Sequence, residues 1–222
     1  MISPSIGYFE SRLFNPEDYA QLVPNLAFQK ATELDGFWGA KIVMSFTNEQ
    51  IRAIVETGKY EKQGDEDYIA KTLIERRDKT GRYWYSRVNP LDNFRFADAD
   101  GTNGYSKGTK KVIQFDDLAV QAGFEDASKT SYQYKLQYHG KDLMDLKIGR
   151  NPSISLTAEM NRIAEQFFTE KGDLSEDDKI LTFKIRTRRG KVASWGKDVK
   201  VHFYYPYDNE KQPQIIAVER EN

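Results

Sequence analysis

The sequence predicts an α+β protein, with a helical region in residues 1–90 followed by a mainly antiparallel β-sandwich of about seven strands in residues 91–222. Up to Val88, apolar residues recur at helical spacing, whereas beyond Pro90 they alternate with polar residues. Asn89 precedes Pro90, and a residue before proline is pushed away from the helical conformation. We therefore place the boundary between the two regions near residue 90.

The helical region contains two glycines inside its first long segment. Apolar residues at roughly helical spacing predict a helix over residues 32–45. Gly36 and Gly39 lie within it, where they cost helix propensity but allow another element to approach closely. Before this helix, Pro16 and the acidic residues after it predict a short helix or a turn.

A capping-box signature marks the next helix. Thr47 is followed three residues later by Gln50, so each side chain can bond the other residue's backbone amide. Gly58 ends this helix. A proline-free segment from Asp65 to Val88 then predicts one long helix, on whose surface Glu75 and Lys79 have the spacing of an ion pair.

The β region is predicted from alternation and from the turn residues between alternating runs. The expected strands span residues 93–97, 112–120, 131–138, 142–148, 153–157, 180–188, 198–205 and 213–220. One segment departs from this period, because its apolar residues recur at helical spacing. It predicts one inserted helix near residues 158–170.

Composition excludes several classes of chemistry. The chain has no cysteine, which removes thiolate metal sites and cysteine nucleophiles, and only His139 and His202 carry imidazoles. With 33 basic and 34 acidic residues the net charge of −1 provides no overall attraction to nucleic acid. We expect no membrane span and no signal peptide in this chain.

Residues 181–201 resemble the last hairpin of a fibronectin-type-III-like sandwich, because two strands flank a turn with Gly190 and Trp195. A longer resemblance links the chain to the C-terminal region of a family of large uncharacterised bacterial proteins with an upstream atypical-kinase-like region, many of them exported. It is carried by residues 6–10, 23–28, 37–41, 45–52, 73–78, 89–91 and 214–220. The chain has no glycine-rich phosphate loop and no metal-binding aspartate motif of kinases. The resemblance therefore implies a kinase-associated C-terminal accessory region.

A candidate metal site follows the first expected strand. Asp98, Asp100 and Asn103 offer oxygen ligands beside glycines, a composition typical of calcium loops. With Asp98 as the first ligand, the twelfth position is Thr109 rather than the glutamate of an EF-hand. An exposed turn uses the same residues, so calcium remains an alternative and no cofactor is predicted.

Candidate anion-binding residues occur in both regions. Arg76 lies seven residues after Ile69, on the apolar face of the long helix. It can therefore be drawn inward to an ion pair or an anionic ligand. Arg186, Arg188 and Trp195 can form a basic and aromatic surface for phosphate or single-stranded nucleic acid. The competing interpretation is a solvated strand face, with Trp195 packed across the sandwich.

The β region is also rich in tyrosine, which can stack on sugar rings or simply fill strand positions. The residues concerned are Tyr132, Tyr134, Tyr138, Tyr204, Tyr205 and Tyr207.

The leading functional hypothesis is a non-catalytic accessory or binding module of a larger bacterial protein, with a protein or polysaccharide partner. One alternative is a carbohydrate-active or phosphate-handling enzyme with carboxylates at the helical/β interface. Another is a calcium- or glycan-binding β module.

Overall fold

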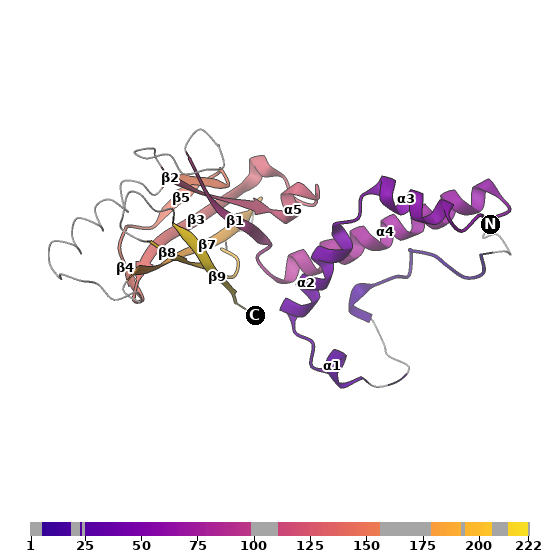
Figure 1. Ribbon diagram of the computed structural model, residues 1–222, viewed down its shortest axis with the longest axis horizontal. Coiled ribbons are helices and arrows are strands. Elements are labelled where there is room, and N and C mark those ends of the chain that lie inside the picture. Colours follow the sequence, from indigo (N-terminus) through magenta and orange to yellow (C-terminus); the bar gives the residue numbers. More distant parts are fainter. Residues whose placement is uncertain are drawn as a thin grey trace. The chain divides into compact units, whose positions relative to one another are not determined.

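The computed structural model describes residues 6–18, 23, 25–98, 111–155, 179–191, 194–205 and 213–221 (Figure 1). The chain is an α+β protein in which helices and mainly antiparallel sheets are both prominent. It divides into two compact units, residues 1–88 and 89–221.

The first unit is helical and is organised around its longest helix. Its elements are η1 (Pro16–Asp18), α1 (Leu26–Gln29), α2 (Glu33–Met44), α3 (Asn48–Glu56) and α4 (Gln63–Arg87). Both α2 and α3 pack on α4. The contacts are made by Val55 and Ile69 on one side and by an edge-on pair of Phe37 and Tyr85 on the other.

Reciprocal capping boxes begin two of these helices, α2 and α3. The predicted capping box at Thr47 is confirmed: Gln50 N donates to Thr47 Oγ1 at 3.2 Å and Thr47 N donates to Gln50 Oε1 at 2.9 Å. Thr32 and Asp35 form a second capping box at the start of α2. These caps satisfy amide groups that an α-helix leaves without partners at its first turn.

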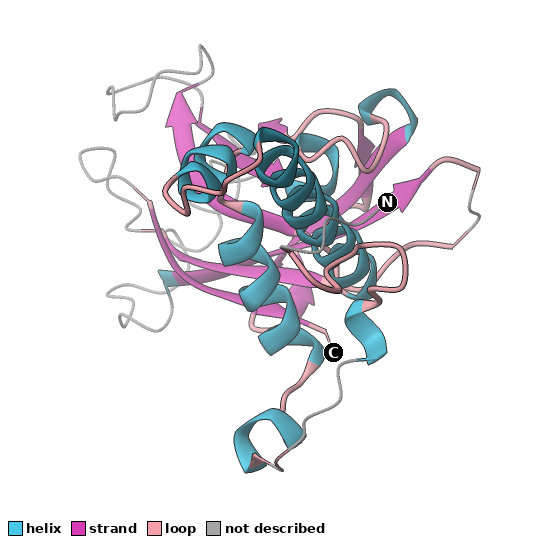
Figure 2. Ribbon diagram, turned by 90° about the vertical axis from the view of Figure 1, so that its right-hand side faces the viewer, coloured by secondary structure: helices cyan, strands magenta, loops and turns pink. Residues whose placement is uncertain are grey.

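The second unit is a sandwich-like arrangement of two antiparallel sheets, shown by secondary structure in Figure 2. The smaller sheet has the order β1-β2-β6, and the larger has the order β4-β3-β7-β8-β9 with β5 also paired to β3. The strands are β1 (Leu91–Asp98), β2 (Lys111–Asp117), β3 (Thr130–Tyr138), β4 (Lys141–Asp142), β5 (Lys147–Gly149), β6 (Ser153–Ser155), β7 (Ile180–Arg189), β8 (Val199–Tyr204) and β9 (Gln214–Arg220).

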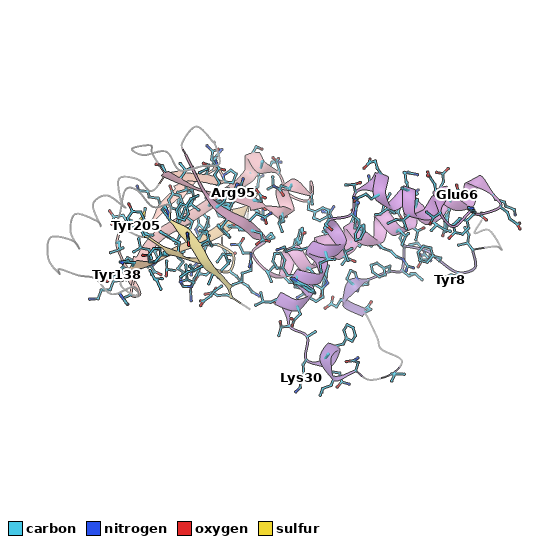
Figure 3. The ribbon with its side chains drawn as sticks, viewed as in Figure 1. Tyr8, Lys30, Glu66, Arg95, Tyr138 and Tyr205 are labelled. Atoms are coloured by element: carbon cyan, nitrogen blue, oxygen red, sulfur yellow. The ribbon has the colours of Figure 1, made fainter. Side chains whose placement is uncertain are left out.

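The core of this unit lies between the two sheets. Ile113 and Phe115 of β2 and Phe183 and Phe203 of β7 and β8 are buried together in it. Tyr138 at the end of β3 belongs to the same cluster (Figure 3). Along β7 every second residue from Leu181 is buried, which is the alternation that the sequence predicts for a strand with one covered face.

Asp117 joins the two sheets with polar contacts at the end of β2. Its carboxylate accepts from Tyr132 Oη of β3 at 3.0 Å and from Arg189 of β7 at 2.8 Å. It also caps the short helix α5 (Leu118–Gln121) by accepting from Val120 N. The expected strand over 112–120 is therefore wrong at its end, because Asp117 stops the ladder and starts a helical turn.

Two further predictions concern the strand over 142–148 and the helix near residues 158–170. The expected strand over 142–148 is two short strands, β4 and β5, separated by residues 143–146, where Met144 is buried in the core. The predicted helix near residues 158–170 lies outside the described residues. Among the residues that the structure does describe, no helix is long and apolar enough to cross a bilayer.

Candidate functional site

A segment of turns and irregular chain, which ends in η1, lies along α4 and is held there by side chains of that helix. We call residues 6–18 the N-terminal strap. Tyr68 Oη donates to the carbonyl of Phe9 at 2.7 Å, and Arg76 Nε donates to the carbonyl of Glu10 at 2.9 Å. Lys79 Nζ donates to the carbonyls of Ser11, Arg12 and Phe14 at 2.6, 3.2 and 3.2 Å. These donors replace the partners that a sheet would supply.

Arg76 is the centre of this contact. Its guanidinium carbon lies 4.3 Å from the ring centroid of Phe9 and 5.0 Å from that of Phe14, so two aromatic rings of the strap face one cation. The side chain is thus drawn inward, and its partners here are a main-chain carbonyl and two rings. A hollow of about 480 Å³ follows along the strap, lined by Leu13, Phe14, Asn15, Pro16, Asp18, Thr80 and Trp84.

The predicted pairing of Glu75 with Lys79 is wrong. Lys79 is directed at the strap carbonyls, and Glu75 accepts from the hydroxyl of Ser11. Glu75 has an ion pair with Lys71 at 3.9 Å instead. Lys79 is drawn to the strap because the strap backbone offers carbonyl acceptors that need donors in a partly buried place, and Glu75 is drawn there as the acceptor for a strap hydroxyl.

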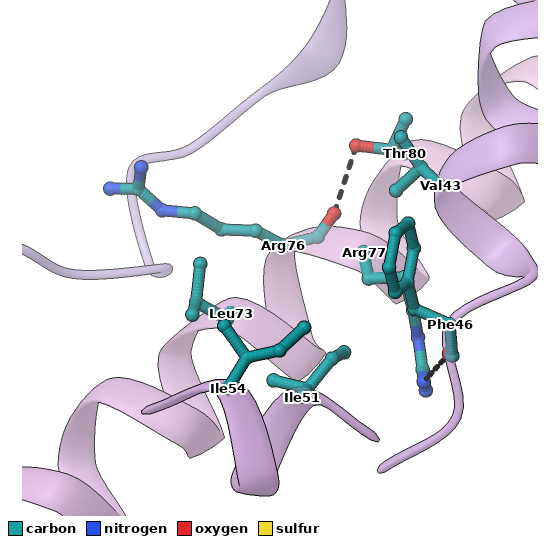
Figure 4. Close-up of a pocket in the computed structure, with 8 residues that line it drawn as sticks. All are labelled: Val43, Phe46, Ile51, Ile54, Leu73, Arg76, Arg77 and Thr80. Atoms are coloured by element: carbon teal, nitrogen blue, oxygen red, sulfur yellow. Dashed lines mark hydrogen bonds between the residues drawn. The ribbon is translucent and has the colours of Figure 1, made fainter. Parts of the chain in front are cut away.

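An apolar groove lies between α2, α3 and α4, which we call the helical groove (Figure 4). Its volume is about 300 Å³. The residues that line it are Val43, Phe46, Ile51, Ile54, Leu73, Arg76, Arg77 and Thr80. Five of these eight side chains are hydrocarbon, and they come from all three helices.

The groove stays open because these helices carry more apolar residues than the unit buries. In α3, Ile51 and Val55 are buried, whereas Ile54 is 56% exposed. Leu73 of α4 is 36% exposed and Phe46 is 43% exposed. Trp38 and Ile42 extend the exposed apolar surface of α2. A contiguous apolar surface of this kind is typical of an interaction site.

The polar residues of the groove are bonded within the chain. Arg77 donates to the carbonyl of Phe46 at 2.7 Å and pairs with Asp78 at 2.7 Å. Thr80 Oγ1 donates to the carbonyl of Arg76 at 2.9 Å, as the dashed line in Figure 4 shows. Because these polar groups already have partners, the surface that the groove offers to a ligand is mainly hydrocarbon.

The outer face of the larger sheet holds the other candidate arginines. Asp198 is only 1% exposed, and both Lys184 and Arg186 pair with it. Burial raises the pKa of Asp198, but hydrogen bonds from Arg186 and then Lys184 outweigh burial and hold the pKa at about 2. Arg186 is therefore committed to an internal carboxylate.

Arg188 and Trp195 lie together on this face. The guanidinium carbon of Arg188 is 4.7 Å from the Trp195 ring. The expectation that Trp195 packs across the sandwich is wrong, since Arg188 belongs to the face of β7 that points away from the core. A small hollow of about 90 Å³ adjoins Arg186 and is lined by Gln133, Tyr134, Lys135, Leu146, Lys184, Arg186 and Asp198.

The candidate calcium ligands are only partly described. Asp98 ends β1 opposite Lys111, whereas Asp100 and Asn103 lie outside the described residues. In the part of the chain that the structure describes, no group of three or more histidine, aspartate or glutamate residues is arranged to hold a metal ion.

The tyrosines do not form one sugar-stacking surface. Tyr132 and Tyr138 are buried in the core, and Tyr134 packs on Phe183. Burial, together with the charge of Asp117, raises the pKa of Tyr132 well above its usual range. Tyr204 lies on the face of β8 that points away from the core, and Tyr207 lies outside the described residues.

The helical groove and the strap contact were missed as sites in the sequence. The groove could have been predicted from the number of apolar residues in and next to α2 and α3. Ile54 and Phe46 widen the apolar face beyond what one partner helix can cover. The strap has no periodicity that reveals it.

Fold and site together define an α+β protein whose helical unit has an open apolar groove. Comparison of the chain with protein-family models, curated proteins and solved structures found no match.

Proposed function

We propose that the protein is a non-catalytic binding module of a larger bacterial protein, and that its helical groove binds an apolar segment of a partner protein. The observation that carries this proposal is the groove itself, because Val43, Phe46, Ile54 and Leu73 remain exposed around a hollow of about 300 Å³. Burying a fully exposed side chain of this kind contributes about 1.5–3 kcal/mol, so covering one that is already partly buried contributes roughly half of that.

The chemistry of the hollows supports binding rather than turnover. The helical groove has no carboxylate in its lining, the hollow along the strap has one, Asp18, and the hollow beside Arg186 has one, Asp198, which is held by two cations. A hydrolase of the usual kind needs two carboxylates or a nucleophile with a base in one cavity. The resemblance to accessory regions of large bacterial proteins agrees with the same function.

A displayed library of random peptides, selected on the full chain, tests the proposal. We expect selected peptides to lose about tenfold or more in affinity for Leu73→Gln, because this change removes hydrocarbon from the groove and keeps helix propensity. Leu146→Gln is the matched control, since Leu146 is an exposed leucine of the β unit and its loss leaves the groove intact.

Two results contradict the proposal. One is a selection that returns no peptide whose binding depends on Leu73. The other is steady turnover by the purified chain of a phosphotransfer or glycoside substrate.

A further inference from the structure

We infer that the segment bound in the helical groove is an amphipathic α-helix with acidic side chains beside its apolar stripe. This inference rests on the proposed function and names the partner's chemistry. It follows from the direction of the groove, from the hydrogen bonds that a bound backbone would need and from the charge along α4.

The groove runs along the helices that form it. On α4 its lining residues are Leu73, Arg76, Arg77 and Thr80, which are spaced by three, four and seven positions and so share one face of the helix. Ile51 and Ile54 present the facing side of α3 at the same spacing. Two neighbouring helix surfaces of this kind accept the side chains of a third helix.

The hydrogen-bonding needs of the bound backbone favour a helix over an extended peptide as the occupant of the groove. An extended peptide in the groove would bury N–H and C=O groups beside Val43, Ile54 and Leu73, which offer them no partner. The hydroxyl of Thr80 is already bonded to the carbonyl of Arg76. A helix satisfies its own backbone and presents only side chains, so it fits an apolar groove at much lower cost.

The same molecule shows what binding of a segment without regular secondary structure requires. The N-terminal strap lies on the flank of α4 where Tyr68, Arg76 and Lys79 donate to its carbonyls. In the helical groove the N–H donors of the lining belong to Arg76 and Arg77, which already donate to Glu10 and to Phe46, and the remaining lining is mainly hydrocarbon. The two flanks of α4 are therefore suited to different backbone conformations.

Charge complementarity gives the polar side of the partner helix. Residues 76–87 contain five basic side chains and one acidic side chain, Asp78, and one of the five, Arg87, pairs with Glu17 at 3.3 Å. Arg76 and Lys79 donate to carbonyl oxygens, which carry no net charge, so their positive charge is not cancelled by those bonds. Asp78 pairs with Arg77, and the charge of Arg77 also acts on Glu49. Acidic residues on the Arg76 side of the groove are favoured.

The test uses the tightest peptide from the selection on the full chain, prepared in three synthetic forms. The first is unchanged, the second has every Asp and Glu replaced by Asn and Gln, and the third has proline at its centre. Fluorescence anisotropy gives the Kd of each form at low and high salt. Circular dichroism of the mixture reports helix formed on binding.

We expect the unchanged peptide to gain helix on binding. The amide form should bind about tenfold more weakly at low salt, and the difference should shrink at high salt because screening weakens charge pairs. The proline form should lose about a hundredfold, since proline inside a helix costs about 3 kcal/mol.

Other outcomes overturn the inference and leave the proposed function standing. These are equal affinity of the proline form, selected peptides without acidic residues, or an amide form that binds equally well. Self-association of the chain that Leu73→Gln abolishes would identify a second copy as the occupant. A selection with no Leu73-dependent binder removes the proposed function itself.

Discussion

The two glycines of α2 have different surroundings. A Cβ atom at Gly36 would lie 2.4 Å from the ring of Trp84, whereas at Gly39 it would meet no atom within 4 Å. The sequence suggested that both permit close approach of another element, and this is correct for Gly36 and wrong for Gly39. The difference is a matter of tertiary contact, which spacing along one helix does not report.

These surroundings predict opposite effects of the same substitution. Gly39→Ala should stabilise the helical unit by about 0.5–1 kcal/mol, because alanine has the better helix propensity. Gly36→Ala should destabilise it by about 1 kcal/mol, because the methyl group displaces Trp84. Urea denaturation followed by tryptophan fluorescence measures both. Shifts in the same direction would contradict the packing of Trp84 on Gly36.

Asp198 and Asp142 provide a second matched pair on the outer face of the larger sheet. Asp198 is 1% exposed and bonded to Arg186, whereas the side chain of Asp142 is 50% exposed and pairs with Lys135. Asp198→Asn should cost about 3 kcal/mol, because it leaves two partly buried cations without their carboxylate. Asp142→Asn should cost less than about 1 kcal/mol. Thermal unfolding at neutral pH compares them.

The depressed pKa of Asp198 also predicts a pH dependence. The folded-state pKa of about 2 lies below the usual aspartate value of 3.8, so the stabilisation is complete above about pH 4 and is lost as the pH falls towards 2. Asp198→Asn should flatten this part of the stability curve. A variant curve that falls as steeply as the wild-type curve between pH 4 and 2 would contradict the assignment.

Among the elements, the N-terminal strap depends most on one side chain. Arg76→Ala removes the hydrogen bonds to the Glu10 carbonyl and the contacts with both aromatic rings. We expect faster amide exchange and faster proteolysis across residues 6–18 with α4 intact. Arg52→Ala is the control, because Arg52 is an exposed arginine of the same unit whose ion pair is with Asp67 of α4. Equal protection of the strap in both variants would show that Arg76 does not hold it.

Local signals predicted most elements, and tertiary contacts account for the rest. Thr47 and Gln50 define a helix start by themselves, and alternation along β7 shows which residues face the core. The helical turn after Asp117 was missed because its cause is a side-chain cap rather than a periodic pattern. The strap was missed because its partners are on average more than fifty residues away, as in the bond from Arg76 to Glu10.

At the scale of the whole molecule, the two units differ in how completely they cover their apolar residues. Twelve of the fifteen large apolar side chains described as exposed lie between Tyr8 and Leu73, in the helical unit. The β unit buries its largest apolar side chains between its two sheets. This difference is the reason why we propose the helical unit for the binding role and a mainly structural role for the ion pairs of the sheet face.

Amide hydrogen exchange of the full chain, with and without the selected peptide, is the most direct test of that assignment. We predict added protection in α3 and in α4 between Leu73 and Thr80, with the exchange of β7 and β8 unchanged. Leu73→Gln should remove the added protection, and Leu146→Gln should retain it. Protection confined to the β unit would contradict the account, because the bound segment would then lie away from the helical groove.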